Sequence, residues 1–168
     1  MKRIVPVLCL VAAVAGLVGC DQVTKNRAES SLSGGGTAPL VGDVLELRYT
    51  QNRGFAFSVE RWMPDVPPNA VVVAVRLLML ALMLALWWVY RREGWLLHGA
   101  FVLTASGAVG NLVDGIGRGY VVDFLHLKGW PIFNLADVYI AAGVILLLAA
   151  VARSKGADSS PGDTPSPA

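Results

Sequence analysis

Long runs of apolar residues alternate with shorter polar segments along this chain. The four apolar runs are residues 4–19, 70–90, 95–112 and 138–151. A bilayer core of about 30 Å needs about 20 helical residues, so the second run predicts a clear span, the third an adequate span and the first a short one. The fourth run is long enough only if flanking residues such as Phe133 and Ala136 extend it. The pattern predicts an all-α membrane protein with four transmembrane helices.

The segment between the first two runs, residues 21–69, predicts a small extracytoplasmic β element. Apolar and polar residues alternate in "VLELRYT" (44–50) and again in "FAFSVE" (55–60), which is typical of strands. Between them "QNRG" (51–54) signals a turn, since Gly54 accepts a positive φ. We therefore expect a hairpin resting on the membrane surface. In the second outer loop, residues 113–131, the stretch "YVVDFL" predicts a short extended piece.

Basic residues next to the runs predict the orientation. If the four helices alternate, one side carries Lys2 and Arg3, Arg91 and Arg92, and Arg153 and Lys155. Such residues favour the cytoplasm, so we expect both termini inside. We expect residues 1–152 to form the membrane domain. The remainder, 153–168, is rich in Pro, Ser, Gly and Asp and predicts a disordered cytoplasmic tail.

Composition supports a membrane protein and excludes other classes. Hydrophobic residues make up 55% of the chain and charged residues 15%, outside the soluble globular range. A formal net charge of +2, spread along the chain, predicts no nucleic-acid partner. On one helix Cys9 and Cys20 would lie about 16 Å apart and could not form a disulfide. Neither of the two histidines lies in a Cys/His cluster, so we expect no metal site and no cofactor.

Acidic residues gather at the outer ends of the predicted spans. They are Asp21, Asp114, Asp123 and Asp137. We expect no charge in the middle of a span. Because charges within a membrane are costly and mark functional pathways, this distribution argues against a proton-relay transporter and for a site at the outer membrane surface.

Asp123 and Asp137 are the candidate catalytic pair. Each lies in an apolar context, "VVDFL" and "FNLADVYI", where a carboxyl is partly desolvated. Two such carboxyls brought close share a proton, so one acts as a base on water and the other as an acid on the scissile carbonyl. We expect Asp123 to hold that proton more often than Asp137, which lies near a helix N-terminus. This pattern predicts peptide hydrolysis without a metal.

Two other interpretations remain open at this point. Asn134 and Asp137 have the spacing of a helix cap, and Asp123 fits a solvated loop, as in a non-enzymatic four-helix protein or transporter subunit. Alternatively "LVGC", which ends at Cys20, is the cleavage motif of a lipoprotein precursor, with residues 1–19 as its export signal. The product of that cleavage would still carry three spans and almost no soluble passenger.

Four blocks, in this order among the apolar runs, resemble one known family. They are "DQVTK", "NRGFAFS", "GAVGNLVDGIGRGYVVDF" and "FNLAD". With these spacings the chain resembles bacterial lipoprotein signal peptidase (signal peptidase II), an aspartic endopeptidase with four membrane helices. The resemblance implies removal of the signal peptide from diacylglyceryl-modified prolipoproteins just before the lipidated cysteine. It also implies membrane lipid as the surroundings, an active site on the periplasmic side of the inner membrane, and globomycin-type inhibitors. We expect a monomer.

By position, the resemblance implies roles for individual residues. Asp123 and Asp137 match the catalytic aspartates. The residues that match the substrate and inhibitor site are Asn52, Gly54, Gly107, Asn111, Asn134 and Ala136. Those that match structural positions are Asp21, Lys25 and Asp114. Family members usually carry Arg directly after the Asp that corresponds to Asp114, whereas this chain has Gly115. Arg118, in a glycine-rich loop, is our candidate to supply that guanidinium to the substrate site.

Overall fold

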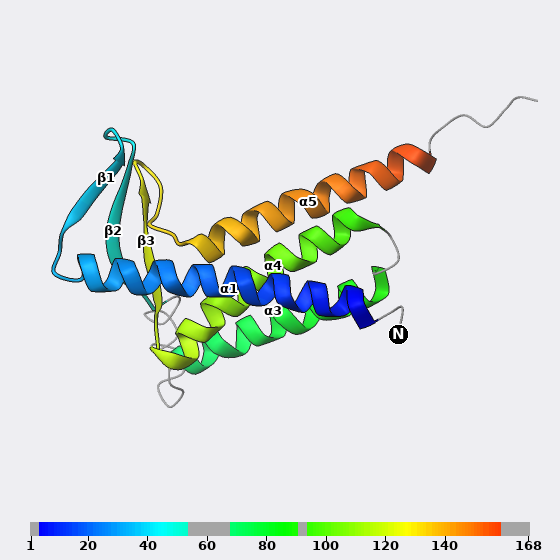
Figure 1. Cartoon of the computed structure of the whole chain (residues 1–168), viewed down its shortest axis with the longest axis horizontal. Coiled ribbons are helices and arrows are strands. Elements are labelled where there is room, and N and C mark those ends of the chain that lie inside the picture. The colour runs from blue at the N-terminus through cyan, green and yellow to red at the C-terminus, as the bar shows by residue number, and fades with distance from the viewer. Residues whose placement is uncertain (1–3, 54–67, 91–93, 159–168) are drawn as a thin grey trace, which may run out of the picture.

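The computed structural model describes residues 4–53, 68–90 and 94–158. Its elements, in chain order, are α1 (Ile4–Leu32), β1 (Thr37–Val41), β2 (Leu45–Asn52), α3 (Pro68–Tyr90), α4 (Trp95–Gly117), β3 (Val121–Leu127) and α5 (Leu135–Asp158). Figure 1 shows the helices running together with the sheet at one end. The helix α4 packs against α1, α3 and α5 and is therefore the centre of the bundle.

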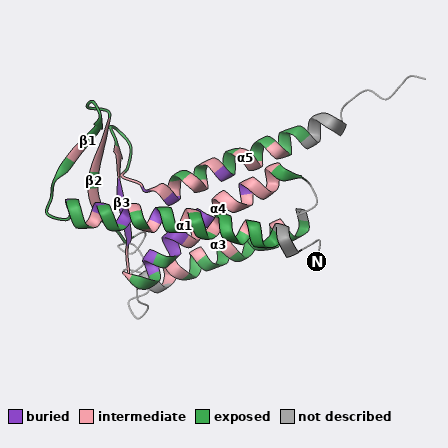
Figure 2. Ribbon diagram, in the orientation of Figure 1, coloured by how far each residue is buried: buried purple, intermediate pink, exposed green. Residues whose placement is uncertain are grey.

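The helices expose apolar side chains and bury polar ones. Leu78, Met79 and Ile145 are among many exposed apolar residues, whereas Asp21 and Lys25 are fully buried. Water favours the opposite distribution, so these helix surfaces suit lipid. Buried residues gather on the part of α4 that lies near β3, and on β3 itself (Figure 2).

Three described helices are long and apolar enough to cross a membrane. They are Val7–Leu32, Trp95–Gly117 and Leu135–Arg153. The apolar stretch of the remaining helix, Val73–Val89, is shorter. The sequence-based expectation of a mostly helical membrane protein with a small β element is therefore confirmed. A crossing by α3, the fourth of the expected spans, stays a prediction.

The helices extend past the ends that hydropathy predicts. The helix α1 continues to Leu32, so residues 21–32 are helical and do not belong to an irregular outer segment. No glycine or proline interrupts this stretch, and Ala28 and Leu32 are buried against the sheet. The helix α5 begins at Leu135 and reaches Asp158, into the segment expected to be a disordered tail.

The helix α4 also continues to Gly117, through the first residues of the predicted second outer loop. The N–H of Arg118 then donates to the carbonyl oxygen of Asp114 at 2.8 Å, and Gly119 adopts a φ of 76°. Such a left-handed glycine just after a helix reverses the chain. It directs the next residues into β3, so Asp123 follows the end of α4 closely.

The sheet is antiparallel, with strand order β1-β2-β3. The predicted extended segments, 44–50 and 120–125, are confirmed over residues 45–50 in β2 and 121–125 in β3. The strand β2 continues to Asn52, through the first two residues of the predicted turn at 51–54, and has β1 and β3 as its neighbours. A hairpin turn at Gly42, whose φ is 48°, joins β1 to β2. The predicted strand partner, 55–60, lies outside the described residues.

A small apolar core joins the sheet to α1. Its buried members are Ala28, Leu32, Val122 and Phe124, with Leu47, Tyr49, Tyr120, Leu125 and Leu135 packed around them. The β2–β3 register is irregular between Leu47 and Thr50, and beyond this point Thr50 pairs with Asp123. The sheet thereby holds Asp123 at the end of the bundle where α4 ends and α5 begins.

Substitution of Gly143 tests the packing of α5 on α4. A Cβ at this position would lie 2.9 Å from the carbonyl oxygen of Ala100 and would collide with the Thr104 side chain. We expect Gly143→Ala to lower the free energy of unfolding by about 1–3 kcal/mol, as overpacking does. Thermal unfolding in detergent measures the effect. Gly99→Ala is the matched control, since its Cβ would lie 3.6 Å from Leu146 Cδ1, an ordinary contact. Equal unfolding temperatures for the two variants would contradict this packing.

Candidate active site

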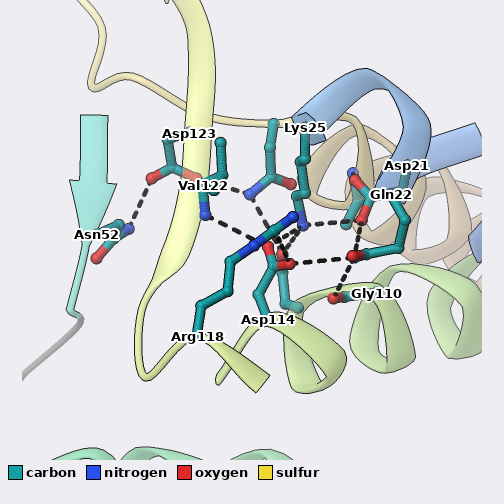
Figure 3. A network of polar contacts seen from close by, with 12 residues as sticks. Asp21, Gln22, Lys25, Asn52, Gly110, Asp114, Arg118, Val122 and Asp123 are labelled. Atoms are coloured by element: carbon teal, nitrogen blue, oxygen red, sulfur yellow. Dashed lines mark hydrogen bonds and ion pairs between the residues drawn. The ribbon is translucent and has the colours of Figure 1, made fainter. Parts of the chain in front are cut away.

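A fully buried lysine lies at the centre of a polar cluster at the sheet end of the bundle (Figure 3). Lys25 Nζ, on α1, lies 2.8 Å from Asp21 Oδ2 and 2.9 Å from Asp114 Oδ2. It also donates to Asn111 Oδ1 at 2.8 Å. These three contacts use all three donors of the ammonium group. A buried ion pair is tolerated only when its partners are satisfied in this way.

The two aspartates bonded to Lys25 connect it to the other elements. Asp114 Oδ2 accepts the Val122 N–H at 3.3 Å, which joins α4 to β3. Asp21 Oδ1 accepts the Ala136 N–H at 2.9 Å, in the first turn of α5. One buried cation therefore holds α1, α4, α5 and β3 together through its carboxylates. That these residues have only a structural role, as the resemblance implies, stays a prediction.

Two asparagines connect the lysine to the candidate catalytic pair. Asn111 Nδ2 donates to Asp137 Oδ1 at 2.9 Å, while its Oδ1 accepts from Lys25. Asn134 Nδ2 donates to Asp123 Oδ1 at 2.6 Å and to Asn111 Oδ1 at 3.2 Å. Because Asn134 also bonds Asp137, one residue contacts both candidate carboxyls. Asn134 thus links Asp123 on β3 to Asp137 on α5.

The capping interpretation of Asn134 and Asp137 is confirmed. Asn134 Oδ1 accepts the Asp137 N–H at 3.0 Å, and Asp137 Oδ2 accepts the Asn134 N–H at 3.2 Å. This is a reciprocal capping box at the start of α5. Capping and the polar cluster use different oxygens of Asp137, so the two interpretations are compatible.

Asp123 lies in a dry environment and not in a solvated loop. Only 2% of its surface is exposed, and Asn52 Nδ2 donates to its Oδ2 at 2.8 Å. Burial raises the pKa of Asp123 to about 6, partly offset by the hydrogen bonds from Asn52 and Asn134 and reinforced by the nearby charge of Asp137. This direction is the one expected of the carboxyl that holds a shared proton.

Gly107 and Ala136 lie where α4 and α5 touch. A Cβ on Gly107 would collide with the carbonyl oxygen of Ala136 and lie 2.7 Å from Ile140 Cγ1. Ala136 is fully buried. Both residues are thus needed for close packing, and their contact with a substrate stays a prediction. Gly54, the remaining predicted site glycine, lies outside the described residues.

Arg118 directs its guanidinium toward Asp114 and α1. Its Nη1 pairs with Asp114 Oδ1, its Nη2 donates to Asn26, and its Nε lies 3.6 Å from Glu29 Oε2. These contacts make Arg118 a connection between the end of α4 and α1. They give no support to the expectation that Arg118 supplies a guanidinium to the substrate site.

The described part of the chain contains no group of three His, Cys, Asp or Glu side chains placed to hold a metal ion. His126 pairs instead with Glu46 across the β2–β3 pair, with 2.8 Å between Nδ1 and Oε1. The aspartates and asparagines of the polar cluster offer the chemistry of carboxyl and amide groups.

Known proteins with similar sequences identify the family. A family model described as Signal peptidase (SPase) II matches residues 13–153. The chain belongs to the signal peptidase II family. A lipoprotein signal peptidase of Caldicellulosiruptor bescii is 37% identical over 136 residues, covering 81% of this chain and 85% of the relative. One of Lactococcus lactis subsp. cremoris is 33% identical over 162 residues, covering 92% and 98%.

Two solved bacterial membrane enzymes share the fold of this signal peptidase II family member. The structure obtained by the in meso method at 2.3 Å resolution has a TM-score of 0.75 and 21% identity, covering 93% of this chain and 94% of the other. The second, at 1.9 Å resolution, has a TM-score of 0.74 and 24% identity, covering 85% and 92%. Membership of this family makes the chain a bacterial membrane peptidase. The comparisons support neither a non-enzymatic protein nor a lipoprotein processed at Cys20.

Arg76 is the charged residue of this region that sequence interpretation missed. It lies within α3, inside the apolar run 70–90 and nearer the start of that run than its middle. Its Nη1 donates to the carbonyl oxygen of Asn111 at 3.1 Å. A signal was present in the sequence, because an arginine inside an apolar helix is costly and faces a polar partner.

Substitution of Lys25 tests whether the polar cluster stabilises the fold. We expect Lys25→Ala to lower the free energy of unfolding by about 3–5 kcal/mol, because Asp21 and Asp114 would stay buried without their cation. Thermal unfolding in detergent measures the loss. Arg27→Ala, two residues along α1 at an exposed position, is the control and should unfold like the unmodified protein. If Lys25→Ala were as stable as Arg27→Ala, the cluster would not stabilise the fold.

Proposed function

We propose that this chain is an aspartic endopeptidase that removes the signal peptide from prolipoproteins before the lipid-modified cysteine. Membership of the signal peptidase II family supports the peptidase activity and the substrate class. The observation that carries the aspartic mechanism is the convergence of Asp123 and Asp137 on Asn134.

In this mechanism Asp137 is the base and Asp123 the acid. Asp137 takes a proton from a water held between the carboxyls, and the water oxygen attacks the scissile carbonyl carbon. Asp123 gives its proton to the carbonyl oxygen, which forms a neutral tetrahedral intermediate. When the C–N bond breaks, the proton on Asp137 moves to the leaving nitrogen, and Asp123 recovers a proton from the intermediate's hydroxyl. The pair ends in its starting protonation state.

The asparagines orient this pair. Asn52 and Asn134 each donate to one oxygen of Asp123, and Asn111 and the Asn134 backbone each donate to one oxygen of Asp137. Fixed donors of this kind reduce the reorganisation needed when charge moves between the carboxyls. They act as positioning groups for the chemistry that we assign to the aspartates.

We assign the site to the periplasmic face of the inner membrane and both termini to the cytoplasm, with α3 as the fourth span. The start of α1, the facing ends of α3 and α4, and the end of α5 all lie at the bundle end opposite the sheet (Figure 1). The basic residues that favour the cytoplasm flank those same ends in the sequence. Exposed tryptophans support two membrane–water interfaces, since Trp88 and Trp95 lie at one end of the bundle and Trp130 at the other.

This orientation suits a lipidated substrate. A diacylglyceryl cysteine keeps its acyl chains in the outer leaflet, so the peptide bond before it reaches the sheet end of the bundle. We propose that globomycin-type cyclic peptides occupy the same site and that the enzyme acts as a monomer.

Substitution of either candidate aspartate tests the mechanism. We expect Asp123→Asn and Asp137→Asn to abolish cleavage of a purified, lipidated prolipoprotein, because neither asparagine can exchange a proton with water. The shortened product is followed by gel electrophoresis and mass spectrometry. Asp43→Asn, in the exposed β1–β2 turn, is the control and should retain full activity. Turnover by either catalytic variant, once it is shown to be folded, would refute the aspartic mechanism.

The pH profile tests the assignment of the acid. Because the pKa of Asp123 is about 6 and the mechanism needs its proton, kcat/KM should fall as the pH rises through about 6. The Asn52 hydrogen bond lowers the pKa of Asp123, so Asn52→Ala should raise it and move this falling limb to higher pH. A limb that stays in place or moves to lower pH would show that Asp123 is not the acid.

A further inference from the structure

Arg76 contacts the backbone that carries a central residue of the site. Its Nη1 donates to the Asn111 carbonyl oxygen at 3.1 Å. A helical carbonyl has a second lone pair, so it can accept this bond in addition to its bond within the helix. The Asn111 side chain bonds Lys25 and Asp137. The position of this turn of α4 therefore sets the position of a hydrogen bond to a candidate catalytic carboxyl.

Gly115 leaves the space that this guanidinium occupies. It is a buried residue of α4. A Cβ at Gly115 would lie 2.8 Å from Arg76 Nη1 and 3.4 Å from Val73 Cγ2. Both of these atoms belong to α3. A side chain at position 115 would therefore require the Arg76 guanidinium to shift from this position.

Acidic residues on three elements of the site stabilise the positive charge of Arg76. They are Asp137 on α5, Asp114 on α4 and Asp123 on β3. Of the other cations, Lys25 and Arg118 are both bonded to Asp114, and Lys25 is bonded to Asp21 as well. The aspartates thus outnumber these two cations, and Arg76 adds a third. A cation in an apolar helix needs such partners.

We propose that Arg76 is a positioning residue of the active site, with its guanidinium admitted by Gly115 to hold the Asn111 turn and to offset the charge of the aspartates. This inference rests on the proposed function. It assigns to α3 a direct part in the site, and it explains why a glycine follows Asp114 in this chain.

Two substitutions at Arg76 separate its charge from its shape. We expect Arg76→Gln to lower kcat on a lipidated prolipoprotein about 10-fold or more, with KM changed less than about 3-fold. Without the positive charge of Arg76, the pKa of Asp123 should rise, so the pH profile should move to higher pH. Arg76→Lys keeps the charge and should leave the pH profile in place while losing part of kcat. A normal kcat and pH profile for Arg76→Gln would overturn the proposal.

A double-substitution cycle tests the role of Gly115. We expect Gly115→Ala to lower kcat in the presence of Arg76 and to have no further effect in Arg76→Ala, since the guanidinium it displaces is then absent. Gly117→Ala is the matched control, because nothing lies within 4 Å of its Cβ position. Additive effects of the two substitutions would contradict the proposal.

Asp123→Asn separates the two claims. If Asp123→Asn is inactive while the Arg76 variants behave normally, the proposed function stands and the role of Arg76 fails. If Asp123→Asn is active, the proposed function itself fails.

Discussion

The ammonium of Lys25 is the group on which the rest of the site depends. It lies at the junction of α1 and α4, fully buried, and each of its donors has an oxygen partner. In an apolar medium an unpaired polar group is strongly destabilising, so the partners of Lys25 cannot move independently. Asp21 extends this constraint to the first turn of α5, and Asp114 extends it to β3. The geometry of the site therefore follows from satisfying one buried cation.

The same constraint produces the chemistry that we propose. Asn111 accepts from Lys25 and donates to Asp137, while Asn134 caps α5 and donates to Asp123. Hydrogen bonds that complete the fold are thus the bonds that orient the carboxyls. Burial keeps water from stabilising both charges, which favours one shared proton. Stability and catalysis use the same side chains, so substitutions in this cluster will affect both unless they preserve charge and shape.

The sequence predicted the features that arise from local pattern. Apolar length identified the long helices, alternation identified the strand at 45–50, and the spacing of Asn134 and Asp137 identified the cap. It did not predict features that depend on distant contacts. The extension of α1 to Leu32 is supported by packing against β3, and hydropathy alone does not report that contact. The strand β1 contains a proline and lies on the sheet edge, so its pairing with β2 left little signal. Arg76 was overlooked because its apolar neighbours dominate the pattern, and only its contact with Asn111 shows why the charge is tolerated.

The central claim is that the buried cluster brings Asp123 and Asp137 together so that Asp123 holds a proton where an ordinary aspartate has lost it. Infrared difference spectroscopy of the purified enzyme during a pH titration observes that proton directly, through the carbonyl stretch of a protonated carboxyl. The account predicts a band that disappears as the pH rises through about 6 and that is absent from Asp123→Asn. A band that titrates near the ordinary aspartate value of about 4, or one that persists in Asp123→Asn, would contradict it.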